Sequence, residues 1–258
     1  MIDSIPIKEE WDLLLPLLGS NAIKDPNDAQ KILGVPDSML ELQGSNRDVI
    51  LWLMEVTVSQ RFGDIMRKIE EYMEKCEGPV MMIVIIIREA RAYSSPEVTS
   101  SAGIWAKTHK TLLNLEEWQH DDDRPVDGLV QSVVPHRWMD RLDITVKVWL
   151  RHPDGHFSFD DANNLYGRSA QLTPEPRTGM AGLEAILKRG MVAIRDSIID
   201  FVEKECEHSQ EDLRALREWM PPTCIFNWDE IVDRVRKASL RDAHKRYKVW
   251  HTANGGHR

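Results

Sequence analysis

Three charged side chains in the first third of the chain have the residue types needed for metal-assisted phosphate chemistry. Asp37 follows a Gly-Val-Pro turn, Glu55 stands inside the apolar run Ile50–Val58, and Lys68 comes farther along the chain. A carboxylate in an apolar strand is costly to bury unless it is paired or binds a cation. Two carboxylates from adjacent strands form a hard oxygen site that suits Mg²⁺, which activates water and stabilises charge on a phosphate.

The elements around these residues predict a layout that brings them together. Ile50–Val58 is rich in apolar and β-branched residues and is predicted to be a strand. Gln60–Cys76 has a helical apolar stripe, and Val80–Ile87 is a second, fully apolar strand. A strand, a helix and a strand in this order predict parallel neighbouring strands joined by a crossover helix. Ser38–Gln43 is predicted to be extended and to pair with Ile50–Val58 through the turn at Gly44-Ser45-Asn46.

This block resembles the PD-(D/E)XK nuclease superfamily, and within it the restriction-endonuclease-like families of bacteria and fungi. The resemblance covers roughly residues 30–90. It rests on Val35-Pro36-Asp37, Glu55-Val56, Ser59-Gln60, Asp64, Lys68 and Tyr72. The resemblance implies a nuclease in which Asp37 and Glu55 bind Mg²⁺ or Mn²⁺ and hydrolyse phosphodiester bonds, with DNA as the favoured substrate.

The lysine departs from the superfamily pattern. It normally stands two residues after the glutamate, and here that position is Thr57. The resemblance implies that Lys68 supplies this charge from the helix, as happens in some relatives. The alternative is that Asp64 and Lys68 form an i,i+4 surface pair, which stabilises a helix by a few tenths of a kcal/mol.

The carboxylates also have structural alternatives. Asp37 is typical of a turn aspartate after proline, and Glu55 would fit a partly solvated strand. Glu9 or Glu10 would be an additional helix acid or a complement to a helix dipole. The alternative function is therefore a catalytically inactive nuclease-fold descendant that acts as a binding or interaction module. A helical partner-binding protein with an incidental motif is a third hypothesis.

The rest of the chain adds a hairpin and several helices. Leu142–Leu150 alternates as a strand, and His156–Phe159 is its predicted return strand after the turn Pro153-Asp154-Gly155. His152 and His156 flank this turn, and a zinc pair there would need further ligands. Asp121–Asp123 is expected to be a solvated loop, and residues 163–178 are expected to be a loop. Helices are predicted at Lys8–Leu18, Asn27–Leu33, Gly179–Glu207, Ser209–Met220 and Trp228–Trp250.

The sequence thus predicts an α/β fold. It would be a small mixed sheet of the restriction-endonuclease-like type, flanked by helices, with an added β-hairpin and a helical C-terminal region. Residues 1–160 are the predicted nuclease-like core with an insertion, and residues 161–258 are the helical region with a basic tail.

Composition indicates an intracellular globular protein. The chain has 258 residues, 42% of them hydrophobic and 29% charged. Its longest apolar run, Val80–Ile87, is too short to span a bilayer, and the N-terminus lacks a signal-peptide pattern. No membrane association is expected, and cytoplasm and nucleus are not distinguished. The three scattered cysteines are expected to be reduced thiols.

Positive charge is concentrated in the C-terminal tail. The net charge is −9, yet residues 234–258 carry eight Lys and Arg against one Asp. Such a segment is a candidate DNA contact, although a solvated basic helix face is the alternative. The candidate phosphate contacts are Arg234, Arg236, Lys237, Arg241, Lys245, Arg246 and Lys248.

Overall fold

The computed structural model describes residues 5–6, 14–15, 22–25, 28–43, 48–58, 62–76, 78–119, 132–159, 165–205 and 213–254. The fold is mixed α/β, as predicted. The chain divides into two compact units. We call the first the sheet unit (Met1–Ile86, Thr145–Gln171 and Arg177–Phe226) and the second the aromatic unit (Ile87–Ile144, Leu172–Pro176 and Asn227–Arg258). The division predicted at residue 160 placed all the C-terminal helices in one region. In the structure, the helix Met180–Glu205 belongs to the sheet unit and the helix Trp228–Asn254 belongs to the aromatic unit.

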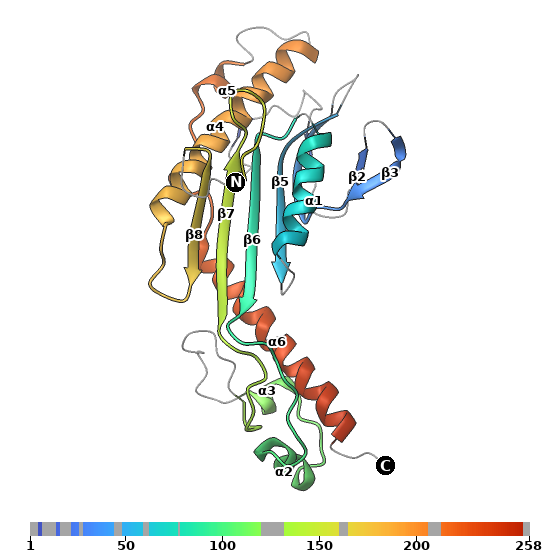
Figure 1. Cartoon of the computed structure of the whole chain (residues 1–258). Coiled ribbons are helices and arrows are strands. Elements are labelled where there is room, and N and C mark those ends of the chain that lie inside the picture. Colours follow the sequence, from blue (N-terminus) through green and yellow to red (C-terminus); the bar gives the residue numbers. More distant parts are fainter. Residues whose placement is uncertain are drawn as a thin grey trace. The chain divides into compact units, whose positions relative to one another are not determined.

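The main sheet has six strands in the order β1-β4-β5-β6-β7-β8 (Figure 1). Its strands are β1 (Leu14–Leu15), β4 (Ser38–Gln43), β5 (Asp48–Val58), β6 (Met81–Glu89), β7 (Leu142–Leu150) and β8 (Gly167–Thr173). A separate two-stranded sheet contains β2 (Ile23–Asp25) and β3 (Asp28–Gly34).

Backbone hydrogen bonds fix the strand directions around the centre of the sheet. β4 and β5 are antiparallel, with Ser38 opposite Met54, as the predicted hairpin requires. The Val80 N–H donates to Leu51 O at 2.7 Å, so β5 and β6 lie side by side with their first residues adjacent. The Arg151 N–H donates to Val80 O at 2.9 Å, which joins the end of β7 to the start of β6. The predicted parallel pair is therefore confirmed, and β7 runs antiparallel to it (Figure 1).

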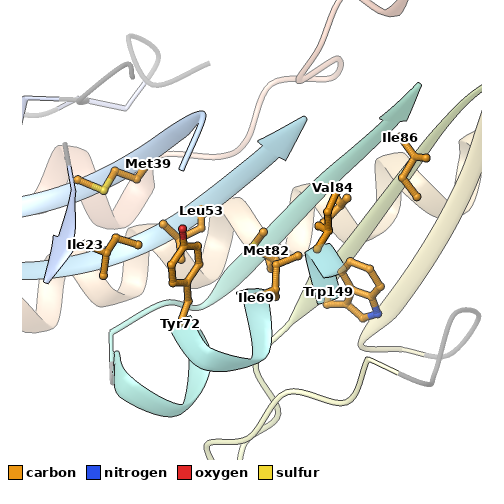
Figure 2. Close-up of a cluster of buried hydrophobic side chains, with 10 residues drawn as sticks. Ile23, Met39, Leu53, Ile69, Tyr72, Met82, Val84, Ile86 and Trp149 are labelled. Atoms are coloured by element: carbon orange, nitrogen blue, oxygen red, sulfur yellow. The ribbon is translucent and has the colours of Figure 1, made fainter. Parts of the chain in front are cut away.

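Helix α1 (Phe62–Lys75) is the predicted crossover and covers one face of the sheet. Its apolar stripe buries Ile65, Ile69 and Tyr72. Figure 2 shows Ile69 and Tyr72 reaching from the helix to side chains of the strands. The buried cluster here comprises Ile23, Met39, Leu53, Ile65, Ile69, Tyr72, Met82, Val84, Ile86 and Trp149.

Helix α4 (Met180–Glu205) packs on the opposite face. A Cβ at Gly190 would lie 2.4 Å from Met81 Sδ and 3.0 Å from Leu150 Cδ2, so glycine permits a close approach of helix to sheet. Met81 and Leu150 alternate with Met82 and Trp149, which face α1. Sheet burial on both faces explains why β6 is apolar throughout. The short α5 (Arg214–Glu218) contacts α4.

Several predictions outside this core were wrong. Asn27–Leu33 was predicted helical, but Asp28–Gly34 pairs as β3 with β2. Leu14 and Leu15, within the predicted helix Lys8–Leu18, pair with β4, and the rest of that segment lies outside the described residues.

The return strand of the hairpin was also placed wrongly. It is not His156–Phe159 but β8, which lies in the predicted loop 163–178. The Leu150 N–H donates to Tyr166 O at 2.8 Å, so residues next to β8 occupy the edge of β7. Phe157 and Phe159 instead pack against the α1-side core.

The aromatic unit contains α2 (Ser101–Thr108), α3 (Leu115–Trp118) and α6 (Trp228–Asn254). Its core joins rings from distant segments: Trp138 lies 5.4 Å from both Tyr247 and Trp250, measured between ring centroids. Trp118 stacks on Tyr247 at 5.9 Å. No helix in the described part of the chain is long and apolar enough to cross a membrane.

Candidate functional site

The pairing of β4 with β5 sets Asp37 beside Glu55. The last registered pair is Ser38 with Met54, so one further step places Asp37 opposite Glu55. Asp37 Oδ2 accepts a hydrogen bond from the Val56 N–H at 2.6 Å, so this side chain extends the backbone pairing by one position. Asp37 is exposed, whereas Glu55 is only 6% exposed.

Helix α1 brings Lys68 to the same place. Lys68 Nζ lies 2.8 Å from Glu55 Oε1 and donates a hydrogen bond to Val35 O at 3.1 Å. The alternative i,i+4 partner, Asp64, contacts Arg67 instead at 3.4 Å. The structure therefore brings together the three residues singled out in the sequence, with Lys68 bridging the buried glutamate and the turn before Asp37.

Glu55 is an under-compensated buried acid. Burial raises its pKa, and the negative charge of Asp37 raises it further. Lys68 and the Tyr72 hydroxyl act in the opposite direction without cancelling the effect of burial. The pKa of Tyr72 is itself raised well above its ordinary value by burial and then by the charge of Glu55. A positive charge added here would therefore be favourable.

Gly34 and Tyr72 complete the site. A Cβ at Gly34 would lie 2.2 Å from the Tyr72 hydroxyl and 3.1 Å from Lys68 Cε, so a larger residue here would displace the side chains of Tyr72 and Lys68. Tyr72 belonged to the sequence pattern, but no role was predicted for it or for Gly34. The closeness arises from a long-range contact, although a glycine just before the Val-Pro-Asp turn is a usable signal.

Buried oxygen atoms gather around Glu55. Among the described residues, Thr57 Oγ1 has no hydrogen-bond partner, the Tyr72 hydroxyl lies next to the Glu55 carboxylate, and Glu55 Oε1 is 2.8 Å from Lys68 Nζ. Thr57 is 1% exposed and shares the α1-facing side of β5 with Glu55, as the predicted alternation requires. Carboxylate and hydroxyl oxygens are donors that Mg²⁺ accepts, so the residues present fit a hard cation held by Asp37 and Glu55.

The seven basic candidates near the C-terminus all lie on α6, but they do not act alike. Arg234 and Lys237 pair with Glu230 and Asp233. Arg246 is turned into the aromatic unit, where it pairs with Glu89, donates to Trp138 O at 3.0 Å and lies over the Tyr93 ring. Of the seven, Arg236, Arg241, Lys245 and Lys248 are exposed and form no ion pair with a described residue.

Other candidates fall in two groups. Glu9, Glu10, Gln60 and Asp121–Asp123 lie outside the described residues. Cys76 and Cys224 are not joined to another described cysteine by a disulfide. Comparison with protein-family models, curated proteins and solved structures finds no match for this chain. The function must therefore be argued from the site itself.

Proposed function

We propose that this protein is a metal-dependent nuclease of the PD-(D/E)XK type that hydrolyses phosphodiester bonds in DNA. The observation that carries the proposal is the meeting of Lys68, from the crossover helix, with a buried Glu55 that lies beside Asp37. A buried ionisable group with a raised pKa and a specific charge partner is a marker of functional sites.

The roles follow from the contacts. Asp37 and Glu55 would hold Mg²⁺ or Mn²⁺, which supplies an activated water and neutralises charge on the phosphate. Lys68 sits 2.8 Å from Glu55 and 34% of its side chain is exposed, so its ammonium can reach both the carboxylate and a bound phosphate. Its role would be to orient the attacking water or to stabilise negative charge in the transition state.

The finer fold assignment is part of the same proposal. The antiparallel pair β4–β5, the crossover α1 and the parallel strand β6 form the sequence of elements expected of a restriction-endonuclease-like core. Asp37 immediately precedes β4, and Glu55 lies in β5, the strand before the crossover helix.

A second candidate is a catalytically inactive descendant that binds DNA or a protein. It is favoured by Thr57 at the usual lysine position and by the ion pair that already engages Glu55. In this reading the pair between Lys68 and Glu55 has a structural role, specifying how α1 packs on β5.

An assay of the full-length chain separates the two candidates. Single- and double-stranded DNA would be incubated with Mg²⁺, with Mn²⁺ or with EDTA. The nuclease proposal expects cleavage with either metal, none with EDTA, and none for Asp37→Asn. Asp64→Asn is the matched control, because Asp64 is an exposed acid on α1 whose ion pair among the described residues is with Arg67. No cleavage, together with a melting temperature that metals do not change, would favour the inactive descendant.

A further inference from the structure

The turn after β7 carries a second group of side chains that could bind a metal ion. It contains two imidazoles, whereas the site at Asp37 and Glu55 offers carboxylate oxygens. The ligand atoms of His152, Asp154 and His156 all lie within 4.8 Å of one another. All three residues belong to the sheet unit. The two histidines flank the turn in the sequence, and the structure adds Asp154 between them as a third possible ligand.

The backbone holds the two histidines opposite each other. The His152 N–H donates to His156 O at 2.8 Å, and the Gly155 N–H donates to His152 O at 2.9 Å. Gly155 has φ of +91°, a left-handed conformation that glycine adopts without strain and that closes the turn. The two imidazoles consequently stack with centroids 4.6 Å apart and an interplanar angle of 11°.

Neighbouring groups orient the ligands further. Tyr166 stacks on the His152 ring with centroids 3.9 Å apart, which restricts rotation of that imidazole. His152 Nε2 is enclosed but has no hydrogen-bond partner among the described residues. Asp154 Oδ1 lies 2.5 Å from His156 Nδ1, so these two possible ligands are already in contact.

We propose that His152, Asp154 and His156 bind a borderline divalent cation such as Zn²⁺. Two imidazoles and one carboxylate suit Zn²⁺, Co²⁺ or Ni²⁺, whereas Mg²⁺ prefers oxygen donors alone. In a tetrahedral site with bonds of about 2.0–2.1 Å, ligand atoms are separated by about 3.4 Å. The ligand atoms lie within 4.8 Å of one another, and the exposed Asp154 and His156 side chains would turn toward His152 to reach that spacing.

Three protein ligands leave one position of a tetrahedral ion open, which is the pattern of sites that bind water or a substrate. His152 also lines a cavity of about 590 Å³, together with Arg151, Tyr166 and Arg189. The Arg189 guanidinium lies 5.7 Å from the Tyr166 ring centroid, on the residue that stacks on His152. Asp196 also lines this cavity, and Arg151 and Arg189 donate to the backbone carbonyls of Cys76 and Leu165, so the charge around the open position is mixed. A water molecule would complete the coordination.

The test is a titration of the metal-free, full-length chain with Zn²⁺ and with Co²⁺. Calorimetry should give one tight Zn²⁺ site per chain, and Co²⁺ should produce the visible absorption of a low-coordinate complex. His156→Ala, Asp154→Asn and His152→Ala should each weaken affinity by at least about tenfold. His156 is exposed, so His156→Ala tests the site without disturbing the core.

Three controls make the outcome decisive. His109→Ala removes an exposed histidine of the aromatic unit and should leave affinity unchanged. Cys224→Ser excludes the exposed thiol as the ligand. Asp37→Asn should not affect Zn²⁺ binding, so loss of nuclease activity and loss of this site are separable. Unchanged affinity in the double variant His152→Ala/His156→Ala, or no bound metal in the unaltered chain, would overturn the proposal.

Discussion

Two buried carboxylates, one in each unit, differ in the number of positive and hydrogen-bonding partners around them. Glu55 in the sheet unit is 6% exposed, and Asp140 in the aromatic unit is 4% exposed. Asp140 lies 2.7 Å from Arg91 Nε, lies near Arg137, and accepts a hydrogen bond from the Arg141 N–H. Glu55 has one ammonium at contact distance and a neighbouring acid.

The pKa values move in opposite directions as a result. For Asp140, burial raises the pKa, but the hydrogen bonds and charges of its arginine and backbone partners outweigh it, so the pKa is lowered overall. For Glu55 burial dominates and the pKa is raised. A buried acid with complete partners is typical of a structural ion pair. A buried acid with incomplete partners is the pattern expected where a cation binds, and in the proposed site Mg²⁺ would supply the positive charge that the partners of Glu55 lack.

The largest expected effect is on cleavage. Glu55→Gln and Asp37→Asn should reduce Mg²⁺-dependent cleavage to the background, because each removes a carboxylate that holds the cation. Asp140→Asn should leave the cleavage rate per folded molecule unchanged. The measurement is a single-turnover cleavage rate on labelled DNA. Equal losses in the Glu55 and Asp140 variants would break the contrast between a functional and a structural acid.

For the free energy of unfolding, substitution of Asp140 should have a larger effect than substitution of Glu55. Asp140→Ala removes hydrogen bonds to charged and backbone partners and should lower the free energy of unfolding by about 3 kcal/mol. Glu55→Gln replaces an acid whose burial is already unfavourable and should change that free energy by no more than about 1 kcal/mol. Urea unfolding, followed by circular dichroism, checks both values. A larger loss for Glu55→Gln would make its pair with Lys68 a structural device.

Lys68 should contribute less to cleavage than the acids. Lys68→Ala should slow cleavage by about ten- to a thousandfold, the effect of losing one electrostatic stabiliser. Arg67→Ala is the matched control, because Arg67 is an exposed neighbour on α1 that pairs with Asp64. A cleavage rate for Lys68→Ala equal to that of Arg67→Ala would remove Lys68 from the site.

The two acids should also give opposite pH dependence. Because the folded-state pKa of Glu55 is raised, its contribution to stability is fullest at low pH and falls as pH rises from the ordinary value of 4.5 to the raised one. The folded-state pKa of Asp140 is lowered, so its contribution is full above 3.8 and is lost as pH falls through the lowered value. Unfolding free energies of Glu55→Gln and Asp140→Asn, each compared with the unaltered chain across pH, should diverge in these separate windows. Parallel curves would contradict the assignment.

The smallest expected effect concerns DNA contacts by α6. Deleting the tail is a poor test, because Tyr247 and Trp250 belong to the core of the aromatic unit. Lys245→Ala/Lys248→Ala should instead weaken DNA binding and reduce the slope of log affinity against log salt by about 2. The control is Arg234→Ala/Lys237→Ala, whose side chains are already paired with acids. Equal slopes for the two double variants would remove this face as a DNA contact.

Local sequence patterns predicted the part of the fold in which consecutive elements of the chain also pack together in space. The alternation in β5, the stripe of α1 and the apolar β6 gave the parallel pair, and with it the meeting of Glu55 and Lys68. β3 and β8 were missed because their strand character comes from pairing with partners that local sequence does not reveal. Asp140 was missed for a similar reason, since its partner Arg91 lies 49 positions away.

The hydrogen bond between the Val56 N–H and Asp37 Oδ2 has a consequence for denticity. With Oδ2 accepting a hydrogen bond from the backbone, Asp37 would offer a cation chiefly its second oxygen and would bind as a monodentate ligand. Mg²⁺ keeps an octahedral shell with several waters and accepts such ligands, whereas Ca²⁺ readily takes bidentate carboxylates in a larger shell. The peptide group that closes the β4–β5 pairing would therefore favour the smaller ion, and Ca²⁺ should occupy the site without supporting turnover.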